Sequence, residues 1–256
     1  MRQFLAFTKK EWREQLRTGK FWVLAILFLL FGVSAPAMAK MTPWLYETMR
    51  NSLAEQGLVV QAVTVTAFTS WQQFYKNVSI MLLVFIIMAS GTLTGEYQRE
   101  TLIPVLTKGL PRWKVIVSKS LVQILCWSIC YWMAFGVTQL YTFWFWREDE
   151  VKHWFLAGSC IYFMGIWLIL LMVLISIWLE SNLNVLLGVG GVTLLCYLAG
   201  MWKKTASWMP TRLLQAGKLL EGALKPKDFF GAIGMALAFG VLFMMLAIAV
   251  FNKKKI

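Results

Sequence analysis

The side chains most often used in catalysis are sparse in this sequence. Its one histidine, His153, excludes a two-histidine metal site and the HExxH motif of zinc peptidases. The sequence contains neither the GxSxG motif that presents a nucleophilic serine nor the GxxxxGK[ST] loop that binds nucleotide phosphates. Glu180 is the one carboxylate close to the apolar runs. The sequence therefore predicts that this chain is not an enzyme and holds no metal or cofactor of its own.

A long polar segment, Gly95 to Lys119, separates two of the apolar runs. It has the sequence GEYQRETLIPVLTKGLPRWKVIVSK. Connections between helices usually need only about 2 to 8 residues. A longer charged connection in so apolar a chain indicates a segment that binds something outside the membrane.

The composition is that of a membrane protein. The 256 residues are 59% hydrophobic and 14% charged, against about 25% charged in soluble domains, and the mean hydropathy is +0.64. The net charge of +13 indicates attraction to anionic lipid headgroups rather than to nucleic acid, because the basic residues lie beside apolar runs. Buried free thiols are predicted for all four cysteines, since each lies in an apolar run: Cys126, Cys130, Cys160 and Cys196.

Six apolar runs are long enough to cross a bilayer, whose core of about 30 Å needs about 20 helical residues. They cover approximately residues 21–39, 78–94, 120–146, 154–179, 183–202 and 230–251. None alternates polar and apolar residues as a membrane β-barrel does. The predicted fold is an all-α integral membrane protein of six transmembrane helices, in a single domain covering residues 1–256. A cleaved secretory signal is the alternative for the first run, but Glu11 and Glu14 in the segment before it favour a retained span.

The basic residues predict the orientation of the six spans. The N-terminal segment holds six, the segment 95–119 five and the C-terminal tail three, and six spans place all three segments on one side. The positive-inside rule makes that side cytoplasmic, so both termini are expected in the cytoplasm of a plasma-membrane protein. The segment 203–228 conflicts with the positive-inside rule, because six spans place it on the opposite side although it carries six basic residues. Five spans would correct this disagreement but would place the lysine-rich tail outside. We expect instead that 203–228 contains a short interfacial or re-entrant helix.

The N-terminal segment has the pattern of an amphipathic helix. At 100° per residue its apolar stripe comprises Met1, Phe4, Leu5, Thr8, Trp12 and Leu16, with Phe7 off the stripe. The adjacent arc is basic: Arg2, Lys9, Lys10, Arg13, Arg17 and Lys20. The sequence predicts a helix in the cytoplasmic interface, with Trp12 and Leu16 toward acyl chains and Arg13 and Arg17 toward phosphates. The alternative is a basic flank that only sets topology.

Glycines in the fifth run suggest close helix packing. Gly188, Gly190 and Gly191 lie within LLGVGGVTLLCYLAG, and glycine lets helix backbones approach closely in a membrane. The contact could lie within one subunit or between two, and plain exposure to lipid is the alternative.

The polar segment resembles the region between the second and third spans of ABC-2 type permeases, the membrane subunits of type V ABC exporters. The resemblance is carried by an acidic residue, a Thr-Leu cluster, a leucine-rich turn, a Pro-Arg element and a lysine entering the next helix. The matching residues are Glu96, Arg99, Glu100, Thr101, Leu102, Leu106, Thr107, Pro111, Arg112, Trp113 and Lys119. The N-terminal helix, the six spans and the basic tail fit the same family.

The resemblance implies a mechanism and partners. In this family the segment forms a cytoplasmic coupling helix that docks on a separate ABC ATPase, which supplies ATP and Mg²⁺, and two permease subunits form one pathway. The expected coupling residues are Glu96, Arg99, Glu100, Thr101, Leu102, Ile103, Leu106 and Arg112. Pro104 departs from the pattern and would split or start that helix.

The low charge within the spans favours an amphipathic or hydrophobic cargo, such as a peptide, a drug or a lipid-like molecule. An ion exporter subunit is the rival within the class. An ATP-independent channel or scramblase is the alternative outside it.

Overall fold

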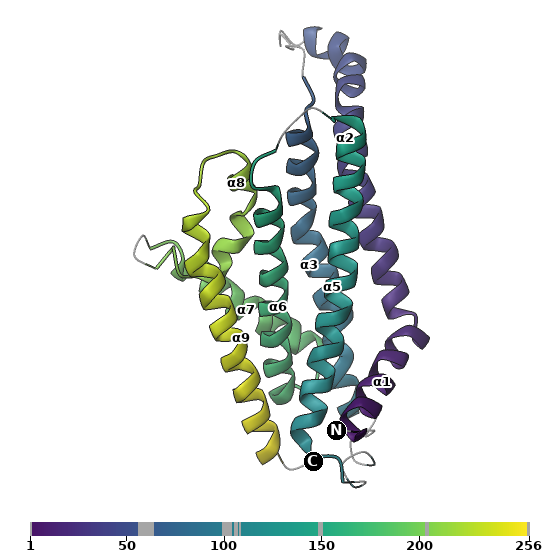
Figure 1. Cartoon of the computed structure of the whole chain (residues 1–256), viewed down its shortest axis with the longest axis vertical. Coiled ribbons are helices and arrows are strands. Elements are labelled where there is room, and N and C mark those ends of the chain that lie inside the picture. The colour runs from purple at the N-terminus through teal and green to yellow at the C-terminus, as the bar shows by residue number, and fades with distance from the viewer. Residues whose placement is uncertain are drawn as a thin grey trace.

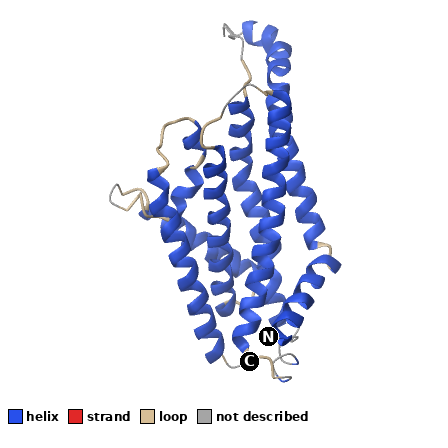
Figure 2. Cartoon of the chain, viewed as in Figure 1, coloured by secondary structure: helices blue, strands red, loops and turns tan. Residues whose placement is uncertain are grey.

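The computed structural model describes residues 2–55, 64–98, 104, 107, 109–147, 151–202 and 205–254. Within these ranges it contains helices and no strand (Figure 2). The helices are α1 (Arg2–Arg17), α2 (Lys20–Glu55), α3 (Ala67–Gln98), α5 (Arg112–Phe145), α6 (Trp154–Trp178), α7 (Asn182–Ala199), the 3-10 helix η1 (Pro210–Gln215), α8 (Gly217–Leu220) and α9 (Lys227–Lys253). In Figure 1 the long helices run along the longest axis of the molecule, and α1 lies against their lower end.

Six helices in the described ranges are long and apolar enough to cross a membrane: α2 over Lys20–Thr48, α3, α5, α6, α7 and α9. The predicted all-α membrane protein with six transmembrane helices is therefore confirmed. The helices extend beyond several of the apolar runs. For example, α3 begins at Ala67 rather than near Val78, because hydropathy detects only the apolar part of a helix that continues through polar residues.

Helix α6 forms the centre of the bundle. Of its most apolar stretch 83% is buried, against 17% for α9 and 11% for α7. It packs against α3, α5, α7 and α9, whereas α2 packs against α3 and α5 on the other side. A helix that is apolar on all sides belongs in such a central position. Cys126, Cys130 and Cys160 are buried free thiols in this core, as predicted, and Cys196 is half-buried.

Aromatic rings of α5 fill glycine positions of α6. An added Cβ would lie 2.2 Å from the Trp127 ring at Gly165 and 2.3 Å from the Phe135 ring at Gly158. The Trp127 indole donates a hydrogen bond to the carbonyl oxygen of Tyr162, at 3.1 Å. These two glycines therefore set how closely α5 and α6 approach, because no larger residue leaves room for the rings.

The fifth crossing is broken into α7 and the pair η1–α8. At its start, Asn182 accepts a hydrogen bond from Thr94, near the end of α3. At its far end, Gly217 lies against Tyr75, and Glu221 accepts a hydrogen bond from Gln72 near the start of α3, at 3.3 Å. The chain from α7 to α8 thus follows α3 in the opposite direction. The helical interpretation of segment 203–228 agrees with η1 and α8, which pack on α6.

The break between α7 and η1 is closed by hydroxyl groups and turn amides. The Thr205 hydroxyl donates to the carbonyl oxygen of Ala199 at 2.5 Å, and the Thr211 hydroxyl donates to that of Cys196 at 3.3 Å. The amide of Gly200 also donates to Cys196, at 3.0 Å. The Gly200 bond is the last i→i−4 bond of α7, and the Thr205 hydroxyl partners the Ala199 carbonyl group, which the last turn of the helix leaves without an intrahelical donor.

Candidate functional site

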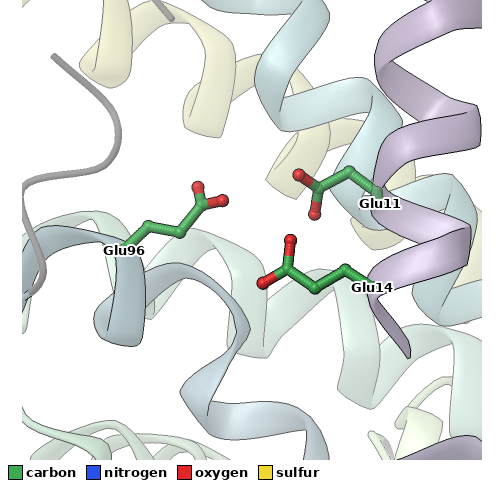
Figure 3. Close-up of side chains that lie close together, drawn as sticks. All are labelled: Glu11, Glu14 and Glu96. Carbon is green, nitrogen blue, oxygen red and sulfur yellow. The ribbon is translucent and has the colours of Figure 1, made fainter. Parts of the chain in front are cut away.

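A cluster of charged side chains joins three helices at the end of the bundle where α1 begins and α9 ends. Lys10, Glu11 and Glu14 come from α1, Glu96 from the last turns of α3, and Lys119 from α5. Figure 3 shows the three glutamates directed toward one another from two helices. We call these five residues the ionic cluster. Its position matters because Glu96 and Lys119 lie near the two ends of the polar segment 95–119.

Lys119 is the buried centre of the ionic cluster. Its Nζ lies 2.7 Å from Glu11 Oε2 and 2.9 Å from Glu96 Oε2, and its side chain is 4% exposed. It also donates to the carbonyl oxygen of Thr92, at 3.3 Å. Next to it, Gln123 donates to the Thr92 hydroxyl, as expected for an interhelical hydrogen bond. One ammonium group therefore links α1, α3 and α5.

Lys10 closes the cluster from the more exposed side. Its Nζ lies 3.0 Å from both Glu11 and Glu14 and 3.2 Å from Glu96. Burial opposes the charge of Lys10, but Glu11, Glu96 and Glu14 outweigh it and raise its pKa. Burial likewise disfavours the Glu14 carboxylate, but Lys10, with help from Lys119 and Lys20, lowers its pKa below the ordinary value. Both side chains are therefore charged at neutral pH.

The same three carboxylates have the spacing of a metal site. Their oxygens lie within 4.8 Å of one another, which would suit a divalent cation. However, the Lys10 ammonium already contacts all three, and Lys119 contacts two. Two ammonium groups against three carboxylates leave a single net negative charge, so the geometry is that of an ion-paired link between helices.

The buried face of α1 differs from the predicted stripe. Phe7, predicted to lie off the stripe, is 8% exposed and Glu11 is 4% exposed, whereas Leu5 is 64% exposed. The reason is that α1 packs on α5, where Lys119 attracts Glu11 and the apolar core receives Phe7. Trp12 packs on Phe21 at the start of α2, with ring centroids 5.5 Å apart.

The remaining interfacial residues are less enclosed. Leu16 is half-buried, and Arg13 and Arg17 are exposed. No membrane accompanies the structure, so the interfacial position of α1 stays a prediction. The positive φ of Gly19, +76°, forms the sharp turn from α1 into α2.

Arg112 lies at the first residue of α5 and contacts the end of α9. Its Nη1 donates to the carbonyl oxygens of Phe251 and Asn252, each at 3.3 Å, and to that of Lys254. All of these acceptors are backbone carbonyl groups. Such contacts have no sequence signal, because every residue carries a carbonyl group.

Most predicted coupling residues lie outside the described residues: Arg99, Glu100, Thr101, Leu102, Ile103 and Leu106. Glu96 and Arg112, on either side of them, are described and both bind other helices. The predicted docking role of the segment stays a prediction.

The glycines of the fifth run divide into two kinds. An added Cβ at Gly188 would lie 2.9 Å from Ile175 of α6, so Gly188 packs within the subunit. At Gly190 and Gly191 nothing lies within 4 Å. Gly190 lines an apolar groove of about 540 Å³ between α3 and α7. Leu83, Ile87 and Leu194 also line it. Contact of this face with a second subunit stays a prediction.

Comparison with known proteins identifies the family. The model of the family described as ABC-2 family transporter protein matches residues 5–254. No curated protein matches the chain. Members of this family are multi-pass membrane components of ATP-binding cassette transporters that associate with an ABC ATPase. Because the match covers nearly the whole sequence, this chain belongs to the ABC-2 transporter family.

Proposed function

We propose that this chain is the pathway-forming subunit of an ATP-driven exporter in the plasma membrane. A separate ABC ATPase, which binds ATP and Mg²⁺, docks on the segment between α3 and α5. Two permease subunits, identical or related, pair to form the pathway. The N-terminus, the coupling segment and the C-terminal tail lie in the cytoplasm. Family membership and the charge distribution support this proposal.

The ionic cluster is the observation that carries the proposal. Glu96 and Lys119, near the two ends of the polar segment 95–119, bind each other at 2.9 Å, and both bind α1. A displacement of the segment by a docked ATPase would therefore act on α1, α3 and α5 together. A loop that merely connected two spans would need no buried ion pair at its base.

An amphipathic or hydrophobic cargo, such as a peptide, a drug or a lipid-like molecule, suits the described surface. The groove between α3 and α7 has an almost wholly apolar lining. Several charged side chains near the spans form ion pairs at the end of the bundle where α1 begins and α9 ends: Glu11, Glu96, Lys119, Glu180 and Lys254. An ion exporter would instead need polar or ionisable groups along its route.

The test is copurification of the ATPase with the double variant Leu102→Asp/Leu106→Asp. If both leucines occupy an apolar groove on the ATPase, two carboxylates there would be buried without partners, which costs several kcal/mol unless the contact opens. The double variant should insert and fold normally but lose its ATPase. The matched control Leu102→Met/Leu106→Met keeps apolar volume at both positions and should retain it.

Two outcomes contradict the proposal. Equal amounts of ATPase with the Asp variant and the parent would show that the segment is not the docking site. Absence of any ABC ATPase from the parent preparation would favour the ATP-independent channel or scramblase.

A further inference from the structure

The described part of the C-terminal tail, residues 252–254, returns onto the end of the bundle where α1 begins and α9 ends. Phe251, in the last turn of α9, is fully buried, and the following Asn252 and Lys253 are exposed. Lys254 is again only 23% exposed. If the lysines of the tail only faced lipid headgroups, Lys254 would be as exposed as Lys253.

Arg112 holds the tail from the α5 side. Its guanidinium group donates to the carbonyl oxygens of Phe251, Asn252 and Lys254. The last carbonyl groups of a helix lack intrahelical donors and form the negative end of the helix dipole, so a guanidinium group is a suitable partner. Here the arginine belongs to α5 and the carbonyl groups belong to α9 and the residue after it. The contact therefore joins two helices.

Lys254 holds the tail on the side of α3 and α6. Its Nζ donates to the carbonyl oxygen of Ile177 at 2.8 Å and lies 3.6 Å from the Glu180 carboxylate. It also lies 4.2 Å from the centre of the Tyr97 ring, within the range of a cation–π interaction. Gln98, the last residue of α3, donates to the carbonyl oxygen of Glu180 at 3.1 Å.

An apolar core lies beneath these contacts. It includes Phe7 of α1, Leu93 of α3, Ile116 of α5, Ile177 of α6 and Phe251 of α9. Each of these side chains is at most 8% exposed. All five helices therefore meet in one packed layer, and the tail is bound directly above it.

The tail thus connects the two helices that carry the ends of the coupling segment. Tyr97, in the last turn of α3, touches Lys254, whereas Arg112, the first residue of α5, binds the carbonyl groups of the tail. We call Arg112, Lys254, Tyr97 and the carbonyl groups of 251, 252 and 254 the C-terminal clasp.

We propose that the C-terminal clasp is a positioning element of the coupling mechanism. It holds the end of α3 and the start of α5 in fixed relation to α9, so that displacement of the coupling segment reaches α9. This inference rests on the proposed function, because it assumes that an ATPase docks on that segment. The ionic cluster connects the same segment to α1, on the opposite side, and does not include α9.

The first experiment uses the full chain alone, in detergent, and measures amide hydrogen exchange. Lys254→Ala removes the contacts to Ile177, Glu180 and Tyr97, so amides of residues 94–98 should exchange about three to ten times faster. Lys253→Ala is the matched control, because it removes the same charge from the exposed neighbouring residue and should leave exchange unchanged. Arg112→Gln should act like Lys254→Ala, and Lys254→Arg should restore slow exchange. Equal exchange in Lys254→Ala and Lys253→Ala would overturn the clasp.

The second experiment uses the chain together with its copurified ATPase and compares exchange in α9 before and after ATP and vanadate are added. The parent and Lys253→Ala should show a nucleotide-dependent change in α9. Lys254→Ala should show less than half of it while keeping the ATPase bound, a result that loss of docking would not produce. If the nucleotide-dependent change in α9 is the same in Lys254→Ala as in the parent, the clasp only caps α9 and its positioning role is refuted. If the parent brings down no ATPase, the proposed function itself fails and this inference fails with it, whatever the first experiment shows.

Discussion

Replacing Lys119 by methionine should destabilise the protein far more than replacing Lys10 by methionine. Either change removes one positive charge from the ionic cluster and leaves three carboxylates with one ammonium group. The two variants therefore have the same net charge and nearly the same side-chain volume. They differ in burial, because the side chain of Lys119 is 4% exposed and that of Lys10 is 46% exposed.

The expected magnitudes follow from this difference in burial. Two unit charges about 4 Å apart attract each other by about 4 kcal/mol at an effective dielectric constant of 20. Loss of solvation offsets much of that attraction while the pair is intact. Removing one partner of a buried pair costs about 3–5 kcal/mol, because the remaining charge stays buried without compensation. In Lys10→Met, Glu11 and Glu96 keep Lys119 as a partner and the lost ammonium group is half exposed, so the expected loss is about 1 kcal/mol, as for exposed pairs.

Reversible unfolding in mixed micelles of a mild detergent and dodecyl sulfate can measure the free energy of unfolding of both variants. The double variant Lys119→Met/Glu11→Gln serves as a second test, since it removes one of the carboxylates that lose their partner. It should recover part of the free energy lost in Lys119→Met. Size-exclusion chromatography of each variant checks that the starting state is folded.

Three results would refute this reasoning. Equal losses in Lys119→Met and Lys10→Met would mean that burial does not set the strength of the pair. If Lys119→Met lowers the free energy of unfolding by less than about 1 kcal/mol, the Lys119 ion pairs are no stronger than exposed pairs. No recovery in the double variant would show that the unpaired Glu11 charge is not the source of the loss.

Three further predictions concern the glycines and the orientation. Gly165→Ala should lower the free energy of unfolding by about 1–3 kcal/mol, because the new Cβ meets the buried Trp127 ring, whereas Gly191→Ala should change it by less than about 0.5 kcal/mol. Gly191→Leu should alter subunit association, and an unchanged oligomer distribution would mean that this face meets only lipid. Cysteines placed at Lys152 and Lys218 should react with an impermeant reagent from outside the cell and one at Lys253 should not, so labelling at 253 from outside would reverse the proposed topology.

The spans could be predicted from the sequence because the bilayer restricts the choice of structure. Backbone groups in hydrocarbon must be partnered within the segment, so a long apolar run such as that of α6 has to be helical. Their lengths could not be predicted, since α3 continues into polar flanks that hydropathy does not score. The break after α7 lies in the basic segment 203–228. The charge of this segment conflicted with the positive-inside rule, but it did not show where the helix would be interrupted.

The contacts of the candidate site were harder to predict, because they depend on residues far apart in the chain. Periodicity placed Phe7 off the apolar stripe of α1, and only packing on α5 buries it. Glu11 is charged and would be expected in solvent, but Lys119, 108 residues away, stabilises it inside. Gly158 and Gly165 do not belong to a cluster of glycines in the sequence. Nothing in the sequence therefore indicated that the Phe135 and Trp127 rings of α5 occupy the space beside them.

The break in the fifth crossing makes this part of the bundle mechanically compliant. Bending a continuous helix such as α6 breaks several i→i−4 backbone hydrogen bonds together. The hydrocarbon core of the bilayer offers no other donors or acceptors to replace them. At the junction of α7 and η1 the ladder is already interrupted, and the Thr205 and Thr211 hydroxyls hold it closed. A hydroxyl can rotate to another acceptor while the helices on both sides remain intact. The half of this crossing formed by η1 and α8 can therefore tilt against α3 and α6 at a lower cost in backbone hydrogen bonds than a continuous helix such as α6 would pay, next to the apolar groove.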